Sequence, residues 1–162
     1  MFIRDFEQND YTAVKNIYQQ GIDTGNATFQ LTVKSWDEWN NSMLSHTRLV
    51  AEENDNVLGW AGLSAVSSRV VYSGVAEVAI YVATNAQGRG VGQKLLSHLI
   101  TESERNNIWT LQASIFPENI GSIKLHENNG FRQLGVREKL GKLNDVWRDV
   151  TFMERRSKII GI

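Results

Sequence analysis

The sequence predicts a mixed α/β (α+β) fold, with helices packed on one sheet in the order β-αα-βββ-α-β-α-ββ. Two observations predict it. Short runs of apolar and β-branched residues alternate with segments whose apolar residues recur at the 3.6-residue period of a helix. Polar capping residues and glycines mark the ends of these segments. The chain has 162 residues and no linker or repeat, so residues 1–162 are expected to form a single domain.

The first elements are one strand and one helix. Residues 2–6 are expected to form the strand. Asn9 or Asp10 then caps a helix that ends near residue 20, because both side chains can accept a hydrogen bond from a first-turn amide. A polar loop follows over residues 21–34.

Two local signals set the next boundaries. Ser35 and Glu38 have the spacing of a capping box, which predicts that a second helix begins at Ser35. Asn54-Asp55 is typical of a tight hairpin turn, so residues 48–53 and 56–66 are expected to be paired strands.

The middle of the chain alternates between strand and helix. Residues 75–82 and 109–116 are expected to be strands. The helix between them, residues 91–105, is predicted from apolar residues at the helical period: Val91, Leu95, Leu96, Leu99 and Ile100.

The last elements are a short helix and two strands. Asn119 is expected to cap a helix over residues 119–128, which ends at Gly130. The strands follow over residues 131–136 and 147–154.

The composition excludes several classes of function. The net charge is −1, so nucleic acid and anionic membrane are not expected as main partners. The absence of cysteine excludes a disulfide scaffold, a thiolate metal site and a cysteine nucleophile, and no metal is expected. The first residues lack the apolar core of a signal peptide, which favours a cytoplasmic location.

The most informative segment is the glycine loop, residues 87–92, which follows a strand and opens a helix. Glycines allow a close backbone approach, and the free amides at a helix start favour an anion, so the loop is suited to a phosphate group. Its spacing differs from the dinucleotide-binding and P-loop fingerprints. A purely structural turn is the alternative.

Three motifs in one order carry a family resemblance. They are Gln-x-x-Gly-x-Gly from Gln87, Asn119-x-x-Ser122, and Gly130-Phe131. Over nearly its whole length the chain resembles the GNAT superfamily of N-acetyltransferases. The resemblance implies a mostly antiparallel sheet and acetyl-CoA as co-substrate. It also implies these acetyl-CoA contacts: Ile80, Tyr81, Val82, Gln87, Gly88, Arg89, Gly90, Val91, Gly92, Gln93, Asn119 and Ser122.

Glu77 is the candidate general base. It shares one strand face with Ala79 and Tyr81. An amine must lose a proton before it attacks a thioester, and a partly buried carboxylate can accept that proton. A solvent-exposed Glu77 at the strand end is the alternative.

Further segments resemble the phosphinothricin/methionine sulfoximine N-acetyltransferase branch. They are Ala27-Thr28-Phe29, residues 77–82, Leu125-His126-Glu127 and Trp147-Arg148-Asp149-Val150. This resemblance implies a small amino-acid-like acceptor and a homodimer. It also implies that Arg69 and Tyr72 hold the acceptor's carboxylate, although Ser73 stands where a second arginine is expected.

Other site candidates have open alternatives. His126 either protonates the departing thiolate or is structural. Trp147 and Asp149 share a strand face and either border the acceptor pocket or pack within the sheet. Phe29 and Trp60 are either aromatic walls of the pocket or part of the core.

The predicted function is acetyl transfer to a small amine in a ternary complex, because no cysteine can carry the acetyl group. The first alternative is a different acceptor: a peptide N-terminus, a polyamine or an aminoglycoside. The second is a non-catalytic acyl-CoA-binding module, which Glu77 beside an intact glycine loop argues against.

Overall fold

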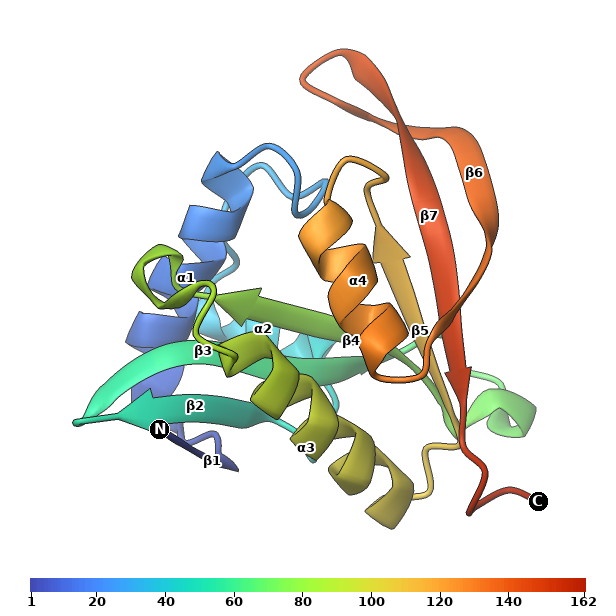
Figure 1. Cartoon of the computed structure of the whole chain (residues 1–162), viewed down its shortest axis with the longest axis horizontal. Helices are drawn as coiled ribbons and strands as arrows, with labels where there is room; N and C mark the ends of the chain where they lie inside the picture. Colours follow the sequence, from blue (N-terminus) through green and yellow to red (C-terminus); the bar gives the residue numbers. More distant parts are fainter.

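Seven strands form one sheet in the order β1-β2-β3-β4-β5-β7-β6 in the computed structural model, which describes residues 1–162 (Figure 1). Every neighbouring pair is antiparallel except β4 and β5. The strands are β1 (Phe2–Asp5), β2 (Leu49–Glu53), β3 (Asn56–Ala65), β4 (Val75–Val82), β5 (Thr110–Ile115), β6 (Arg132–Leu143) and β7 (Val146–Arg156). The predicted mixed, mostly antiparallel sheet is confirmed.

Four α-helices and three 3-10 helices connect the strands. The α-helices are α1 (Tyr11–Asp23), α2 (Trp36–Ser42), α3 (Val91–Arg105) and α4 (Ile120–Asn128), and the 3-10 helices are η1 (Gln8–Asp10), η2 (Val70–Tyr72) and η3 (Thr84–Ala86). None of the helices is long and apolar enough to cross a membrane.

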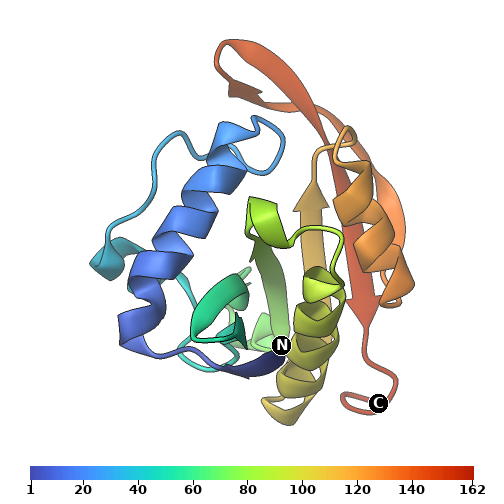
Figure 2. The same cartoon turned by 60° about the vertical axis from the view of Figure 1, so that its left-hand side comes forward.

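The helices lie on both faces of β4. Figure 2 shows α1 on one side of β4 and α3 with α4 on the other. The side chains of β4 alternate accordingly. Tyr81 packs directly against Gly21 of α1, where an added Cβ would lie 2.7 Å from the ring, whereas Val82 faces Gly92 of α3. Glu77 shares the Tyr81 face and therefore lies on the α1 side of the sheet.

The core is continuous through the sheet and α3. The five apolar positions predicted for α3 are all buried, and the helix bounds match the predicted residues 91–105. An aromatic group packs between α1, α2 and the sheet, in which Trp60 contacts Trp39, Tyr18 and Tyr81.

Strands β4 and β5 pair over only three residues before they separate. The parallel pairs are Val75 with Thr110, Ala76 with Leu111, and Glu77 with Gln112. Beyond Glu77, the edges of both strands that face each other have no strand partner. Buried backbone groups need hydrogen-bond partners, so this gap is suited to an extended ligand.

The first helix departs from the prediction at both ends. The Asp10 side chain does not cap α1, because it accepts hydrogen bonds from Arg4 at 2.7 and 2.8 Å and from the Glu7 amide at 2.8 Å. The helix also continues past residue 20 to Asp23, through Gly21. The expected capping box between Ser35 and Glu38 is present.

The last hairpin is longer than predicted. Strand β6 covers twelve residues rather than the six of residues 131–136. Asn144 and Asp145 form its turn, with φ of 48° and 63°, which repeats the Asn54-Asp55 turn between β2 and β3. Register shifts between Arg137 and Gly141 interrupt the alternation of side chains, and this hid the second half of the strand from sequence patterns.

Candidate functional site

The gap between β4 and β5 opens into a cleft of about 1010 Å³. Its walls come from β4, β5, the glycine loop, α4 and the loop that follows α1. Most of the residues predicted to contact acetyl-CoA line this cleft: Ile80, Tyr81, Val82, Gln87, Gly88, Gly90, Val91, Gly92, Gln93, Asn119 and Ser122. Segments far apart in the chain therefore meet at one site.

The glycine loop leaves open space at the start of α3. Gly88 and Gly90 have φ of +74° and +78°, a conformation that favours glycine. A Cβ at either position would meet no protein atom within 4 Å. Gly90 is the N-cap of α3 and brings no capping side chain, so the first amides of the helix remain available. This geometry fits the pyrophosphate of coenzyme A.

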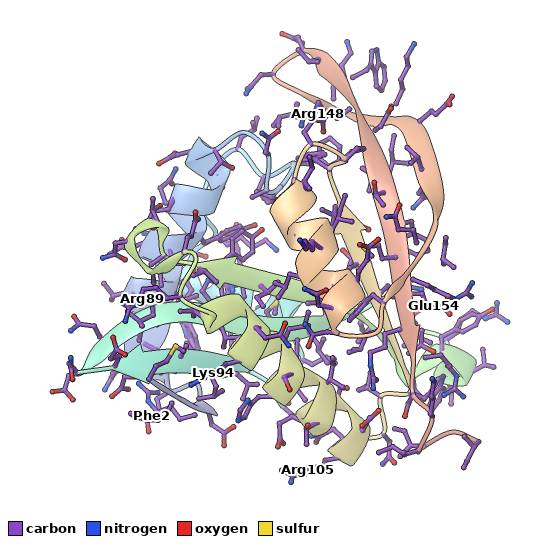
Figure 3. The ribbon with its side chains drawn as sticks, in the orientation of Figure 1. Phe2, Arg89, Lys94, Arg105, Arg148 and Glu154 are labelled. Carbon is purple, nitrogen blue, oxygen red and sulfur yellow. The ribbon has the colours of Figure 1, made fainter.

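Arg89 differs from its neighbours in the loop. Its side chain forms an ion pair with Glu53 at the end of β2, and Arg89 does not line the cleft (Figure 3). Glu53 also forms an ion pair with the N-terminal amine of Met1 at 3.3 Å. The Arg89 side chain therefore ties the glycine loop to the β2–β3 hairpin.

Helix α4 presents polar groups to the opposite wall. The Asn119 side chain caps the helix by accepting from the Ser122 amide at 3.2 Å, and it donates to the Asn26 carbonyl at 3.3 Å. Lys124, which the sequence analysis did not single out, is the only lysine or arginine that lines the cleft. Helical spacing from Gly121 would have placed Lys124 on this wall.

Glu77 lies where β4 and β5 begin to separate. The carboxylate is half-buried in the cleft wall and accepts a hydrogen bond from the Ser114 hydroxyl at 3.4 Å. Burial raises the pKa of the Glu77 carboxyl, and the Ser114 bond and the positive charge of Arg137 partly offset this shift. A raised pKa brings a carboxylate closer to the range useful for a general base.

Ser114 was missed because only the register reveals it. Gln112 pairs with Glu77 across the parallel strands, so Ser114, two residues further along β5, lies on the same face. Sequence alone gives no signal for such a pairing between distant strands.

His126 is buried at the base of the cleft wall. Its Nδ1 lies 2.8 Å from the Ser122 carbonyl, which can only accept, so Nδ1 carries the proton. Its Nε2 is buried without a hydrogen-bond partner. The imidazole packs edge-to-face with the Phe131 ring, and the two ring centroids are 4.9 Å apart. Burial lowers the pKa of His126, which favours the neutral ring with a bare Nε2.

The loop after α1 forms a further wall of the cleft. Phe29 lines the cleft and packs edge-on against Phe116 at 4.9 Å. Arg148 of β7 fixes this loop by donating to the Gly25 carbonyl at 2.8 Å and to the Asn26 side chain at 2.7 Å. Figure 3 shows Arg148 near the start of α4. Its guanidinium also stacks 4.1 Å from the Phe116 ring centroid.

Two groups of predicted acceptor residues lie away from the cleft lining. Trp60 is 3% exposed and belongs to the core, where it stacks on the back of Tyr81. Arg69 and Tyr72 are exposed at η2, with the Arg69 guanidinium 5.3 Å from the Tyr72 ring centroid.

The predicted residues of β7 also lie outside the lining. Trp147 is 55% exposed and contacts the Lys142 ammonium, which lies 5.2 Å from its ring centroid. Asp149 accepts a hydrogen bond from the Lys139 amide at 2.8 Å and so stabilises the irregular part of β6. No cluster of three or more His, Asp or Glu side chains could hold a metal ion.

Comparisons with known proteins agree with this geometry. Residues 3–152 match the family model described as an acetyltransferase (GNAT) domain. An L-methionine sulfoximine/L-methionine sulfone acetyltransferase of Salmonella typhimurium is 31% identical over 159 residues, which cover 95% of this chain and 93% of that protein.

Solved structures give the same result. A phosphinothricin acetyltransferase from Sinorhizobium meliloti, in complex with acetyl-CoA, has a TM-score of 0.87 and 30% identity over 96% of this chain and 87% of its own. A ribosomal-protein-alanine N-acetyltransferase from Brucella melitensis has a TM-score of 0.88 and 29% identity over 97% of this chain and 100% of its own. The resemblance predicted from the motifs is confirmed.

Proposed function

This chain belongs to the GNAT acetyltransferase family, and we propose that it acetylates the α-amino group of a small amino-acid-like acceptor with acetyl-CoA. The proposed acceptors are of the phosphinothricin, methionine sulfoximine or methionine sulfone type. One observation carries the proposal: the half-buried Glu77 carboxylate lines the same cleft as the glycine loop. A proton acceptor and a phosphate-binding turn thus border one continuous space.

Acetyl-CoA supplies the activated acetyl group as a thioester. We propose that the amides at the start of α3 bind its pyrophosphate and that the unpaired edge of β4 hydrogen-bonds the pantetheine arm. Asn119, Ser122 and Lys124 border the same space from α4. A backbone amide of β4 is the proposed donor to the thioester oxygen as it becomes negative.

Glu77 is the proposed general base, acting directly or through one water molecule. An α-amine is largely protonated near neutral pH, so its attack on the thioester requires a proton acceptor. Transfer is proposed to be direct within a ternary complex, because the chain has no cysteine to form an acyl-enzyme. The cleft walls increase the reaction rate by holding the amine beside the thioester.

His126 is proposed to have a supporting role rather than to protonate the thiolate. The Nδ1 proton is engaged by the Ser122 carbonyl, and Nε2 of the neutral ring has no proton to give. This arrangement supports the structural alternative. The departing thiolate can take a proton from the solvent.

A homodimer is also proposed, as the branch resemblance implies. The β6–β7 hairpin extends beyond the rest of the sheet and carries several exposed apolar side chains (Figure 1): Leu134, Val136, Leu140, Val146 and Trp147. Burial of these side chains against a second copy would remove apolar surface from water. Light scattering of the purified chain measures the oligomeric state directly.

An acceptor screen tests the proposed function. Thiol release from acetyl-CoA is measured with methionine sulfone, methionine sulfoximine, phosphinothricin, a polyamine, an aminoglycoside and a peptide with N-terminal alanine. The peptide is included because of the likeness to the Brucella enzyme. We expect the amino-acid analogues to give the highest kcat/KM. Turnover of the peptide alone would favour the other acceptor class, and binding of CoA without any turnover would favour a non-catalytic module.

A further inference from the structure

The strand face that carries Glu77 continues across the sheet to β6. Ser114, which donates to Glu77, pairs with Phe152 of β7, and Phe152 pairs with Gly135 of β6. Arg137 follows two residues after Gly135 and pairs with Val150. Side chains two residues apart on a strand share a face, so these residues form one diagonal row on the α1 side of the sheet. The β6 residue in direct register with Glu77, through Gln112 and Glu154, is Arg132.

Arg137 is a free cation at the end of this row. Its guanidinium lies 5.8 Å from the Phe152 ring centroid, and the residue is exposed just beyond the residues that line the cleft. No carboxylate lies within ion-pair distance of it, whereas Arg148 is engaged by Asn26, Gly25 and Glu118. Strands β7 and β5 lie between β6 and β4, with about 4.8 Å between neighbouring strands. The Arg137 guanidinium lies over Phe152 of β7 and is therefore nearer to β4 than the backbone of β6 is.

The charge of Arg137 reaches Glu77. It is the one cation that affects the pKa of the Glu77 carboxyl, and it lowers that pKa. The Arg69 guanidinium instead stacks on Tyr72 at η2. The position expected to hold a second arginine is Ser73. The segment between β3 and β4 therefore does not supply the expected pair of arginines, whereas Arg137 of β6 is a candidate to bind the carboxylate.

We propose that Arg137 binds the carboxylate of an α-amino-acid acceptor whose amino group lies at Glu77. This inference rests on the proposed function and names the residue that selects for a free carboxylate. An α-amino acid carries its amine and its carboxylate on one carbon, and the sheet face presents a base and a guanidinium in one row. Arginine suits this role because its planar fork can form two parallel hydrogen bonds to a carboxylate.

The test compares two acceptors in two variants. The acceptors are methionine sulfone and its carboxamide, in which an amide replaces only the carboxylate. In Arg137→Gln we expect the KM for methionine sulfone to rise about 10-fold to 100-fold, as for loss of a charge-assisted hydrogen bond, while the KM for the carboxamide changes little. In Arg137→Lys the KM for methionine sulfone should be intermediate. Each KM is divided by the wild-type value for the same acceptor, which removes the difference in amine basicity.

Arg132→Gln is the matched control, because the exposed Arg132 lies on the same strand and pairs only with the partly buried Glu154 at 3.4 Å. It should leave both KM values and the Kd for CoA unchanged. An equal rise in both KM values for Arg137→Gln, or no rise in either, would overturn the inference alone. Failure of the wild-type protein to acetylate any amino acid would overturn the proposed function and the inference with it.

Discussion

The cofactor side of the cleft (β4, the glycine loop and α3) and its acceptor side (the loop after α1, β5, β7 and β6) use the chain differently. On the cofactor side, the binding groups are backbone amides within one short stretch, and glycines keep the approach open. On the acceptor side, the proposed groups are the side chains of Ser114, Arg137 and Arg148, together with Glu77 of β4 where the two sides meet, so that four strands contribute. In the proposed site, cofactor binding therefore depends on local backbone geometry, whereas acceptor selection depends on strand register.

The comparison predicts that the largest single effect comes from Glu77, where the two sides meet. Glu77→Gln keeps the size of the side chain and removes the proton acceptor. We expect kcat to fall by about 100-fold to 10,000-fold, with the Kd for CoA unchanged. Steady-state kinetics and calorimetric titration with CoA measure the two quantities. Wild-type kcat in a folded variant would remove Glu77 as the base.

The next largest effect is expected from the cofactor side alone. Gly90→Val places a side chain in the space that the pyrophosphate is proposed to occupy, at a φ of +78°. The Kd for acetyl-CoA should rise on the order of 10-fold to 100-fold. Gly25→Val is the matched control, since Gly25 also has a positive φ, of +67°, with open space around it, but lies on the acceptor side. Equal losses of CoA binding in both variants would indicate backbone strain rather than crowding.

A smaller effect is expected from loosening the acceptor side. Arg148→Met keeps apolar contact with Phe116 and removes the hydrogen bonds to Gly25 and Asn26. The KM for the acceptor should rise about 3-fold to 10-fold, and the Kd for acetyl-CoA should stay constant. If instead the Kd for acetyl-CoA rises and the acceptor KM does not, the two sides are not separable as described.

The smallest effect is expected in the pH profile. The Ser114 hydrogen bond lowers the pKa of Glu77, so Ser114→Ala should raise that pKa. The base is active when deprotonated, and the acid limb of kcat/KM should therefore move to higher pH, with the plateau little changed. The Glu77→Gln variant, measured over the same pH range, should lack this limb. An acid limb that stays in place in Ser114→Ala would show that another group controls it.

Local patterns in the sequence predicted the cofactor side well. The bounds of β4 and α3 match, because a strong hydrophobic period and the glycines that precede α3 involve only neighbouring residues. The capping box at Ser35 and the Asn119 cap were predicted for the same reason. The side-chain cap predicted at Asp10 is absent, because the Asp10 carboxylate accepts a hydrogen bond from Arg4 of β1 instead.

Long-range pairing explains what the sequence analysis missed. The row from Glu77 to Arg137 requires the register of four strands, and no local pattern contains it. The extension of β6 was missed for a related reason, because the irregular segment after Arg137 breaks the alternation that marks a strand. Trp60 illustrates the converse case: its residue type suits a pocket wall, but its neighbours place it in the core.

The brief pairing of β4 with β5 also has a mechanical consequence. The sheet consists of two groups of neighbouring strands, here called blades: β1-β2-β3-β4 and β5-β7-β6. The blades are joined by only three residue pairs between β4 and β5. A molecule lying in the gap contacts both blades at once and supplies hydrogen bonds where the protein's own ladder stops. We therefore expect acetyl-CoA, bound in this gap as proposed, to act as an added strand that makes the sheet more rigid.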